Sequence, residues 1–417
     1  MPRLRPCKTS FILHGLWKND SGSIAILFAV SLTAIALAIG AGFDMGRGFV
    51  SARTMQSATD AAALAAASLD GNASESQQTA MALSIFGVNY TSGFTEKPAV
   101  AVTFGNETVS VTADTTMPRT LSGIIDNTPI ALSKSATAWR GPRDPICVLA
   151  LAPSGAGAFN IRGQAELSLQ NCAGQSNSDD ASSLYQQGGS SASADSFCSY
   201  GGFAGSNFTP KPYENCRKAE DPYEGLPVPS SYSCDYISKT YIKGSHVVTP
   251  GTFCKGMTIE AHANVTFQSG TYIIKGGEFR IAAGSKVYGN GVTFYLIGNN
   301  TKVTMVSGAD VTLKAPTSGT YEGILFAQDP ASNPGDINKI EGGANTTLVG
   351  ALYFPTQTLN VSSTSTFGAS SPYMPLVAWK LDFSGSAMTV IKHDRDAANM
   401  GGNYSMPTTR PSARLTN

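Results

Sequence analysis

Charged residues are scarce in this 417-residue chain, at 14% of the total against roughly 25% in an average soluble domain. The 29 basic and 29 acidic side chains balance to a formal net charge of +0. Binding to nucleic acid depends on a surplus of positive charge, so we expect no nucleic-acid partner. The hydrophobic content of 42% is too high for a disordered chain. The composition therefore indicates a folded protein.

Catalytic motifs are missing as well. The chain has no G-x-S-x-G sequence, no H-E-x-x-H sequence and no Gly-Lys pair typical of a phosphate-binding loop. Its few histidines lack metal-ligating neighbours at helical spacing; they are His14, His246, His262 and His393. We therefore expect no enzyme activity, no cofactor and no metal site.

The first distinctive segment is an uncharged run from Ser21 to Phe43. From Ile24 onward it holds 20 mostly apolar residues, and about 20 residues of helix span the roughly 30 Å hydrocarbon core of a bilayer. The rival interpretation is a cleaved signal peptide, whose apolar core is usually about 7–15 residues long. The length favours a retained transmembrane helix over residues 22–43, with the membrane lipid bilayer as its partner.

Basic residues flank this run unequally. Four precede it and two follow it closely; they are Arg3, Arg5, Lys8 and Lys18, then Arg47 and Arg53. Because positive residues favour the cytoplasmic side, we expect residues 1–21 in the cytoplasm and the bulk of the chain across the membrane.

The cysteines agree with export. One, Cys7, lies before the apolar run, and six lie beyond it: Cys147, Cys172, Cys198, Cys216, Cys234 and Cys254. The spacings of 25, 26, 18, 18 and 20 residues leave no C-x-x-C pair for zinc or redox chemistry. An even number in an oxidising compartment predicts three disulfides, whose pairing the sequence leaves open among 15 arrangements.

An alanine-rich stalk helix is predicted to continue the transmembrane helix over residues 44–70. Apolar and small residues recur there at spacings of three and four, without proline. Three small residues of this stripe are candidates for close helix packing: Ala58, Ala62 and Ala66. The stalk packs either on its own domain or against the stalks of partner proteins.

Three stretches of this region resemble the N-terminal module of the TadG-like proteins of the bacterial tight-adherence (Tad, or Flp) pilus system. They are Asp20-Ser-Gly22-Ser-Ile-Ala-Ile-Leu-Phe-Ala, Gly42-Phe-Asp44-Met-Gly-Arg47 and Gln56-Ser-Ala-Thr-Asp60-Ala-Ala-Ala-Leu-Ala. The positions that carry the resemblance are Gly22, Asp44, Arg47, Gln56 and Asp60. The resemblance implies a single-pass protein of the bacterial inner membrane with a periplasmic domain. It also implies other pilus-assembly proteins as partners and no enzyme activity.

Residues 71–142 are predicted to form a small α/β unit. Ser74 and Gln77 form a capping-box pattern at the start of a short helix. Alternating apolar residues on both sides of Gly105-Asn106 predict a β-hairpin, and a further strand is expected within Ile130–Trp139.

Residues 143–392 carry a degenerate repeat. A pattern of small polar residues followed by valine ends at Val265, Val287 and Val311, with spacings of 22 and 24 residues. A period near 20–24 residues with several short strands is typical of a right-handed parallel β-helix, whose coils bury their apolar faces against one another. The rival fold is a β-sandwich. We therefore predict a mainly β protein.

Two parts of the exported region lack the repeat. Residues 173–233 are rich in Ser, Gly and Pro, and we expect an insertion tied down by disulfides. Residues 393–417 are polar and are expected to form a flexible tail.

Two hypotheses of function follow. The first is a non-catalytic structural protein of pilus assembly. The second is a membrane-tethered β-helix that binds or cleaves cell-wall or surface polysaccharide. The side chains available to the second are Tyr272, Tyr288, Tyr295, Tyr321 and Tyr353, with Asp310, Asp329, Asp336 and Asp382. Such tyrosines are more typical of a strand-rich core, and the acids fall in separate predicted turns, whereas paired catalytic carboxylates lie about 5–9.5 Å apart. We therefore favour the structural hypothesis.

Overall fold

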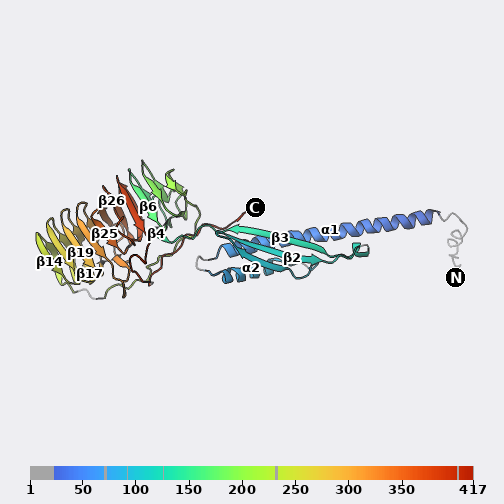
Figure 1. The fold of residues 1–417 in the computed structure, drawn as a ribbon, viewed down its shortest axis with the longest axis horizontal. Helices are drawn as coiled ribbons and strands as arrows, with labels where there is room; N and C mark the ends of the chain where they lie inside the picture. Colours follow the sequence, from blue (N-terminus) through green and yellow to red (C-terminus); the bar gives the residue numbers. More distant parts are fainter. Residues whose placement is uncertain are drawn as a thin grey trace, which may run out of the picture. The chain divides into compact units, whose positions relative to one another are not determined.

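The computed structural model describes residues 23–69, 73–91, 93–124, 126–230, 233–401 and 403–416. Gly22 and the predicted cytoplasmic segment, residues 1–21, lie outside the described residues. The chain divides into two compact units (Figure 1). The helix–sheet unit comprises Met1–Ala67, Ser74–Trp139 and Leu415–Asn417, and the solenoid unit comprises Ser68–Ala73 and Arg140–Arg414.

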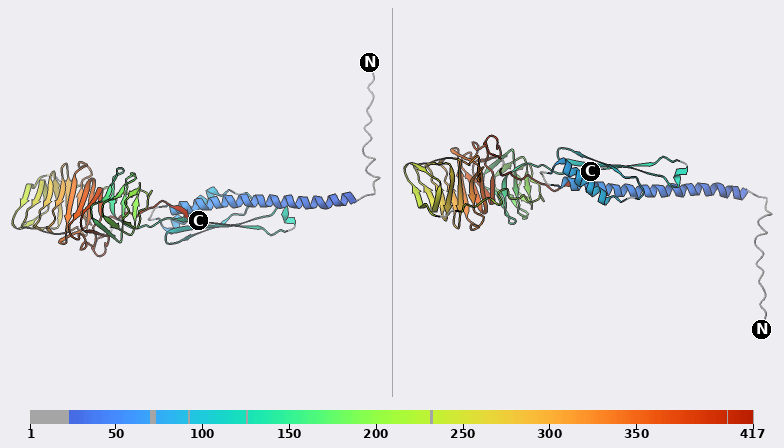
Figure 2. Two further views of the ribbon diagram at one scale, coloured as in Figure 1. Left: turned by 90° about the horizontal axis from the view of Figure 1, so that it is seen from above. Right: turned by 90° about the horizontal axis from the view of Figure 1, so that it is seen from below.

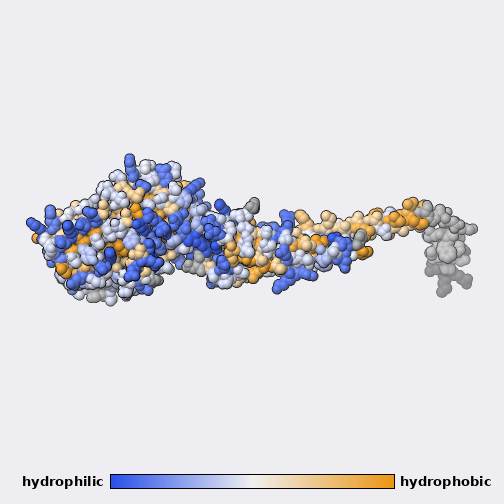
Figure 3. Space-filling model, viewed as in Figure 1, coloured by the Kyte–Doolittle hydropathy of each residue, from blue (hydrophilic) through white to orange (hydrophobic). Residues whose placement is uncertain are grey.

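The first helix, α1, runs unbroken over Ser23–Ala67, so its 45 residues extend about 68 Å at 1.5 Å per residue (Figure 2). Its N-terminal half is apolar and exposed: Ile26, Phe28 and Ile39 are 67%, 65% and 63% exposed. Figure 3 shows this apolar surface along the helix. The predicted helix that is long and apolar enough to span a membrane is therefore present.

The C-terminal half of α1 packs against the other elements of the helix–sheet unit. These elements are α2 (Glu75–Asn89), β1 (Ala99–Phe104), β2 (Thr108–Met117), the 3₁₀ turn η1 (Ser122–Ile124) and β3 (Ile130–Trp139). The three strands pair antiparallel in the order β1-β2-β3, and β29 (Arg414–Thr416) extends this sheet beside β3.

Local sequence explains how α2 begins. The Ser74 hydroxyl accepts the backbone N–H of Gln77 at 3.3 Å, and the Gln77 side chain accepts the backbone N–H of Ser74 at 2.8 Å. This is the capping box that the sequence predicts, and it satisfies two of the N–H groups that a helix start leaves without partners.

The alanine stripe of α1 belongs to the core of the helix–sheet unit. Met55, Ala58, Ala62 and Ala66 are all 0% exposed. Methyl side chains let a helix lie close to its neighbours, and here those neighbours are α2, β2 and β3 of the same chain. The structure therefore favours a stalk packed on its own domain over a stalk whose alanines face partner stalks.

The solenoid unit stacks short, parallel strands into about ten coils. Coils 1–3 contain β4 (Ile146–Ala150), β5 (Phe159–Ile161), β6 (Glu166–Gln170), β7 (Ala173–Ser176), β8 (Leu184–Gln186), β9 (Ser191–Ser193), β10 (Phe197–Ser199), β11 (Phe203–Ala204) and β12 (Phe208–Thr209). Coils 4–7 contain β13 (Tyr236–Tyr241), β14 (Gly244–Val248), β15 (Gly251–Ile259), β16 (Ala263–Phe267), β17 (Gly270–Lys275), β18 (Glu278–Ile281), β19 (Lys286–Asn290), β20 (Val292–Ile297), β21 (Lys302–Met305) and β22 (Asp310–Lys314). Coils 8–10 contain β23 (Ile324–Gln328), β24 (Ile337–Gly342), β25 (Thr346–Val349), β26 (Ala351–Ser363), β27 (Leu376–Gly385) and β28 (Met388–Lys392).

The valine repeat marks the register between coils. Val265 pairs with Val287, and Val287 pairs with Val311, each one coil further along. The interior is filled by stacked aromatic rings, with the Phe294 ring centroid 4.7 Å from that of Phe279 and 5.2 Å from that of Phe326. The predicted β-solenoid is thereby confirmed over the β-sandwich.

The order of the coils in the stack differs from their order in the sequence. β27 of coil 10 pairs with β4 of coil 1, and β28 of coil 10 pairs with β6 of coil 1. The spatial order is therefore 4-5-6-7-8-9-10-1-2-3. The chain enters in the interior of the stack, winds to one end, crosses to the other end and winds back to coil 1.

The expected insertion at residues 173–233 is only partly an insertion. Its first part, up to Thr209, forms coils 2 and 3. The apolar repeat does not reveal these coils, because small polar residues take the place of large apolar ones in their interior. The Ser183 hydroxyl donates to the Ser176 hydroxyl at 2.7 Å and accepts from the Ser199 hydroxyl at 3.1 Å, and all three residues are 0% exposed. A polar interior is stable when its groups bond to one another.

The crossing segment, described over residues 210–230 and 233–235, lies between coil 3 and coil 4 in the sequence and runs along the outside of the solenoid. Tyr223 and Leu226 are 1% and 6% exposed and belong to an apolar cluster with Ile273, Tyr295 and Tyr353. The Tyr353 hydroxyl donates to Asp221 at 2.8 Å. Burial raises the pKa of Asp221. The segment is therefore docked by side-chain packing as well as by disulfides.

The expected flexible tail is also largely docked. The backbone N–H of Ile146 donates to the carbonyl of Pro407 at 2.8 Å, and the N–H of Thr409 donates to the carbonyl of Asp144 at 3.0 Å. Thr409 is 0% exposed. The tail supplies hydrogen-bond partners to the chain where it enters coil 1, which its polar composition did not reveal.

Three disulfides join neighbouring segments, as predicted in number. The pairs are Cys147–Cys172, Cys198–Cys216 and Cys234–Cys254, with Cα–Cα distances of 5.6, 5.8 and 5.6 Å. The first links coil 1 to coil 2, and the other two tie the crossing segment to the coils, Cys216 to coil 3 and Cys234 to coil 5. Each disulfide joins two cysteines that are consecutive in the sequence, because the segments that carry them are spatial neighbours.

Candidate membrane-proximal site

Asp44, the first acidic residue after the apolar run, is only 1% exposed. Its carboxylate accepts hydrogen bonds from four donors in the connection between β2 and β3, two backbone N–H groups and two hydroxyls. The backbone N–H groups of Thr120 and Ser122 each lie 3.1 Å from a carboxylate oxygen, and the Ser122 hydroxyl lies 2.6 Å away. The Thr120 hydroxyl donates as well. A single side chain of α1 thus holds the start of η1 in place.

These donors set the charge of the site. Hydrogen bonds from the hydroxyl groups of Ser122 and Thr120 hold the pKa of Asp44 well below its ordinary value of 3.8. The backbone N–H groups of the same two residues lower this pKa further, by a smaller amount. Asp44 is therefore ionised at neutral pH although the chain covers it. Hydrogen bonds to an ionised acceptor are stronger than those between neutral groups, which suits this position to fixing two elements together.

Arg47 completes the arrangement one helical turn later. Its Nη1 atom lies 3.5 Å from the Asp44 carboxylate and donates to the Thr120 hydroxyl at 3.2 Å. The guanidinium carbon lies 4.7 Å from the ring centroid of Phe94 and 5.8 Å from that of Phe43. We refer to Asp44, Arg47, Thr120 and Ser122 as the Asp44 cluster.

Gln56 and Asp60 form a second polar contact further along α1. The Gln56 amide donates to the Asp60 carboxylate at 2.7 Å and to the backbone carbonyl of Ser135, in β3, at 3.1 Å. Three of the five residues that carry the family resemblance therefore bond to the β2–β3 region of their own chain: Asp44 and Arg47 through Thr120, and Gln56 through Ser135. Gly22 is outside the described residues.

The hydrogen bonds of this site connect α1 to the β2–β3 connection, which is a structural role. The donors to Asp44 are two hydroxyls, two backbone N–H groups and one guanidinium. The sequence did not single out Thr120 and Ser122, because they lie 76 and 78 residues from Asp44 and only the fold brings them there.

The acidic residues considered for polysaccharide chemistry lie on different elements. Asp310 begins β22, and Asp329 accepts the backbone N–H of Ala331 in a turn. Asp382, on β27, accepts the Arg162 guanidinium at 2.6 Å. Among the described residues, no three His, Cys, Asp or Glu side chains gather in a group that could hold a metal ion.

The tyrosines do not form one surface. Tyr272, Tyr295 and Tyr353 are 0%, 0% and 2% exposed, whereas Tyr288 is 49% exposed. Tyr321 packs against the same cluster that holds Tyr223. A sugar-stacking platform needs several exposed rings side by side, so the core interpretation fits these residues better.

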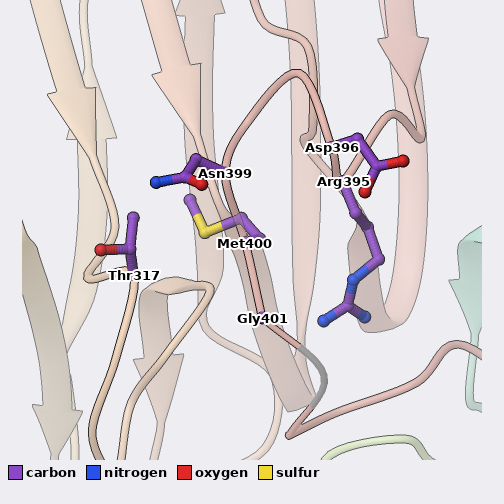
Figure 4. Close-up of a pocket in the computed structure, with 6 residues that line it drawn as sticks. All are labelled: Thr317, Arg395, Asp396, Asn399, Met400 and Gly401. Atoms are coloured by element: carbon purple, nitrogen blue, oxygen red, sulfur yellow. The ribbon is translucent and has the colours of Figure 1, made fainter.

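An open cleft of about 330 Å³ lies in the solenoid unit beside the docked tail (Figure 4). Its lining residues are Thr317, Arg395, Asp396, Asn399, Met400 and Gly401. The Arg395 guanidinium lies 5.6 Å from the Tyr373 ring centroid and donates to the carbonyl of Tyr404, so it is already engaged. In Figure 4 the Asp396 carboxylate points away from Asn399 and Met400, so these labelled side chains do not converge on one point.

Comparison with known proteins identifies the N-terminal part of the chain. Residues 22–69 match the model of a family described as putative Flp pilus-assembly TadE/G-like. The match covers the apolar run, the Asp44 and Arg47 positions and the alanine stripe, and it confirms the resemblance to the N-terminal module of TadG-like proteins. The sheet and the solenoid lie beyond the matched residues. No curated protein and no solved structure matches the chain.

Proposed function

We propose that this protein is a non-catalytic, single-pass component of Tad pilus assembly, anchored in the bacterial inner membrane with its solenoid in the periplasm. The observation that carries the proposal is the TadE/G-like match over residues 22–69, which coincides with an exposed, apolar half-helix. An uncovered helix of this composition is costly in water and stable in lipid.

The charge pattern and the disulfides support the orientation. Four basic residues precede the apolar run, which favours a cytoplasmic N-terminus. The three disulfides all lie beyond the run, and such bonds persist in the periplasm but are rare in the cytoplasm. Both features support a solenoid outside the cytoplasm.

The packing of α1 supports a structural role. Because the Asp44 cluster and the buried alanine stripe join α1 to the sheet, the orientation of the helix fixes the orientation of the sheet. Because these contacts lie where α1 would leave the membrane, they would keep the sheet of the helix–sheet unit at a fixed distance from the membrane surface. The separate positions of Asp310, Asp329 and Asp382 and the burial of Tyr272, Tyr295 and Tyr353 give less support to the rival hypothesis of polysaccharide cleavage.

Membership of a pilus-assembly family suggests other pilus-assembly proteins as partners. Ala58, Ala62 and Ala66 are covered by the chain itself, so they offer no surface for such partners. We propose that partners contact the exposed half of α1 within the bilayer, where Leu27 and Leu32 are 68% and 52% exposed.

Deletion of the gene tests the proposed role. We expect loss of surface pili and of adhesion, scored by electron microscopy and by surface attachment, with both restored by the full-length gene. Normal pili in the deletion strain would contradict the proposal. Phosphatase fusions after Leu69 test the orientation, because alkaline phosphatase folds only in an oxidising compartment. An inactive phosphatase together with an active cytoplasmic reporter at that point would place residue 69 in the cytoplasm and contradict the proposed orientation.

A further inference from the structure

The connection between β2 and β3 lies beside the apolar half of α1. A Cβ atom placed on Gly40 would lie only 2.6 Å from the Cβ of Leu121. Glycine at position 40 thus allows the connection to touch the helix backbone. Figures 1 and 2 show the end of this connection beside α1 in every view.

The connection leaves two large apolar side chains uncovered. Leu121 is 50% exposed and Ile124 is 83% exposed, and Ile39 and Phe43, which flank Gly40 along α1, are 63% and 56% exposed. Asp126, Asn127 and Thr128 of the same connection are exposed as well. Thr120 and Ser122 are held to Asp44 by hydrogen bonds. Exposed apolar side chains that adjoin an apolar helix surface are typical of a contact with a membrane or another protein.

The length of α1 places this loop relative to the membrane. The helix from Ile24 to Gly40 rises roughly 24 Å, and the apolar run that would fill a core of about 30 Å extends to Phe43. Gly40 is therefore one helical turn inside the end of the run. Whatever packs against Gly40 enters the boundary between acyl chains and headgroups.

The polar groups of the loop are suited to this depth. The backbone N–H groups of Thr120 and Ser122 are bonded to Asp44, so they do not require water. Arg119 pairs with Asp126 at 3.3 Å and donates to the carbonyl of Thr128 at 2.9 Å. Long basic side chains at such a boundary extend toward the headgroups.

We infer that the β2–β3 connection inserts Leu121 and Ile124 into the headgroup–acyl boundary of the periplasmic leaflet, as a second membrane contact beside α1. The inference rests on the proposed membrane anchoring of α1. Lipid is the occupant because the exposed loop residues continue the apolar surface of the helix that faces the same bilayer. Two attachment points would stop the helix–sheet unit from tilting about a single helix.

Site-directed spin labelling of the full-length protein in nanodiscs of phosphatidylethanolamine and phosphatidylglycerol tests this inference. C7S removes the one cysteine outside the three disulfides, and I124C then introduces the labelling site. L121C is a second site in case the first alters the fold. N106C is the control, because Asn106 is exposed in the turn at the other end of the ten-residue β2. A34C reports on the helix itself, since Ala34 is exposed in the middle of the apolar run.

The measured quantity is the ratio of a label's accessibility to oxygen to its accessibility to a water-soluble nickel chelate, and this ratio rises with depth in the lipid. We expect the ratio for I124C to be severalfold higher than that for N106C and lower than that for A34C. If the accessibility ratios for I124C and L121C equal that for N106C while the label on A34C lies in lipid, the inference is overturned and the proposed membrane anchoring of α1 still stands. Labels on I124C and L121C shielded from both reagents would mean burial against protein and would also overturn it. A water-accessible label on A34C would overturn the proposed anchoring and the inference together.

Discussion

The carboxylate of Asp44 accepts both the backbone N–H of Ser122, at 3.1 Å, and the Ser122 hydroxyl, at 2.6 Å. The two residues are 78 positions apart, and one follows the apolar run while the other begins η1. This contact fixes the β2–β3 connection at the level where α1 would leave the membrane. The account of the helix–sheet unit depends on it, and most of the predictions below concern the same interface.

Replacing Asp44 by Asn should loosen the helix–sheet unit. The amide keeps one acceptor oxygen but turns an NH₂ group toward the N–H and hydroxyl donors of Thr120 and Ser122, so two donors lose their partner. We expect a lower unfolding temperature for D44N than for the wild-type chain in detergent micelles, measured by circular dichroism. Asp114, exposed on β2, provides the control substitution D114N, which should leave the unfolding temperature unchanged. Equal unfolding temperatures for the two variants would show that the Asp44 contacts contribute nothing.

The same carboxylate predicts a pH dependence. Because the hydrogen bonds from Ser122 and Thr120 hold the folded-state pKa of Asp44 below 3.8, its contribution to stability is present above pH 3.8 and is lost as the pH falls below that value toward the folded-state pKa. The difference in unfolding temperature between wild type and D44N should therefore be constant from pH 6 to pH 4 and shrink below pH 3.8. A difference that is the same at pH 3 and pH 6 would contradict this assignment.

The alanine stripe predicts an overpacking effect. Ala62 is 0% exposed, so A62L forces three extra carbon atoms into a filled contact between α1 and its neighbours, at a cost of about 1–3 kcal/mol in unfolding free energy. Ala61, on the adjacent and partly exposed face, gives the matched control A61L, which should cost less. Urea unfolding of the full-length protein measures both. A neutral A62L would mean that the stripe is open and free to contact partner stalks.

Tyr223 should hold the crossing segment to the solenoid. Its ring lies 5.2 Å from that of Tyr353 and 5.6 Å from that of Tyr404, and it is 1% exposed. Y223A removes a large buried ring, a change that costs roughly 3–5 kcal/mol for phenylalanine or tryptophan. Limited proteolysis should then cleave residues 210–235 much faster. Y223F keeps the buried ring and loses the hydroxyl, which contacts the Met406 sulfur at 3.6 Å and hydrogen-bonds with Tyr373, so it should resist the protease far better than Y223A. Equal cleavage rates for Y223A and wild type would mean that the disulfides alone restrain the segment.

Local patterns explain which features were predictable. The start of α2 depends on Ser74 and Gln77 alone, and the pairing of Val265 with Val287 depends on a repeat that is legible in the sequence. The length and composition of the apolar run likewise determine α1. These features arise from interactions between residues close in sequence or from a period, so the sequence was sufficient.

Features that depend on distant contacts were not predictable. The adjacency of coil 10 and coil 1 joins β27 to β4, more than 200 residues away, and no local pattern encodes it. The apolar repeat does not extend to coils 2 and 3, because Ser176, Ser183 and Ser199 bond to one another in an interior where the repeat elsewhere has Val or Phe. Thr120 and Ser122 acquired a role only when the fold brought them to Asp44.

The most direct test of the account is the intact mass and the location of the mature protein. Cells are fractionated, membranes are washed with alkaline carbonate, and the protein is extracted for mass spectrometry. We predict that it stays with the washed membranes and keeps residues 24–43, with a mass near 43.4 kDa if the N-terminus is intact. Soluble mature protein that lacks the first forty residues would show that the helix is a signal peptide, and it would contradict the anchor on which the proposed function depends.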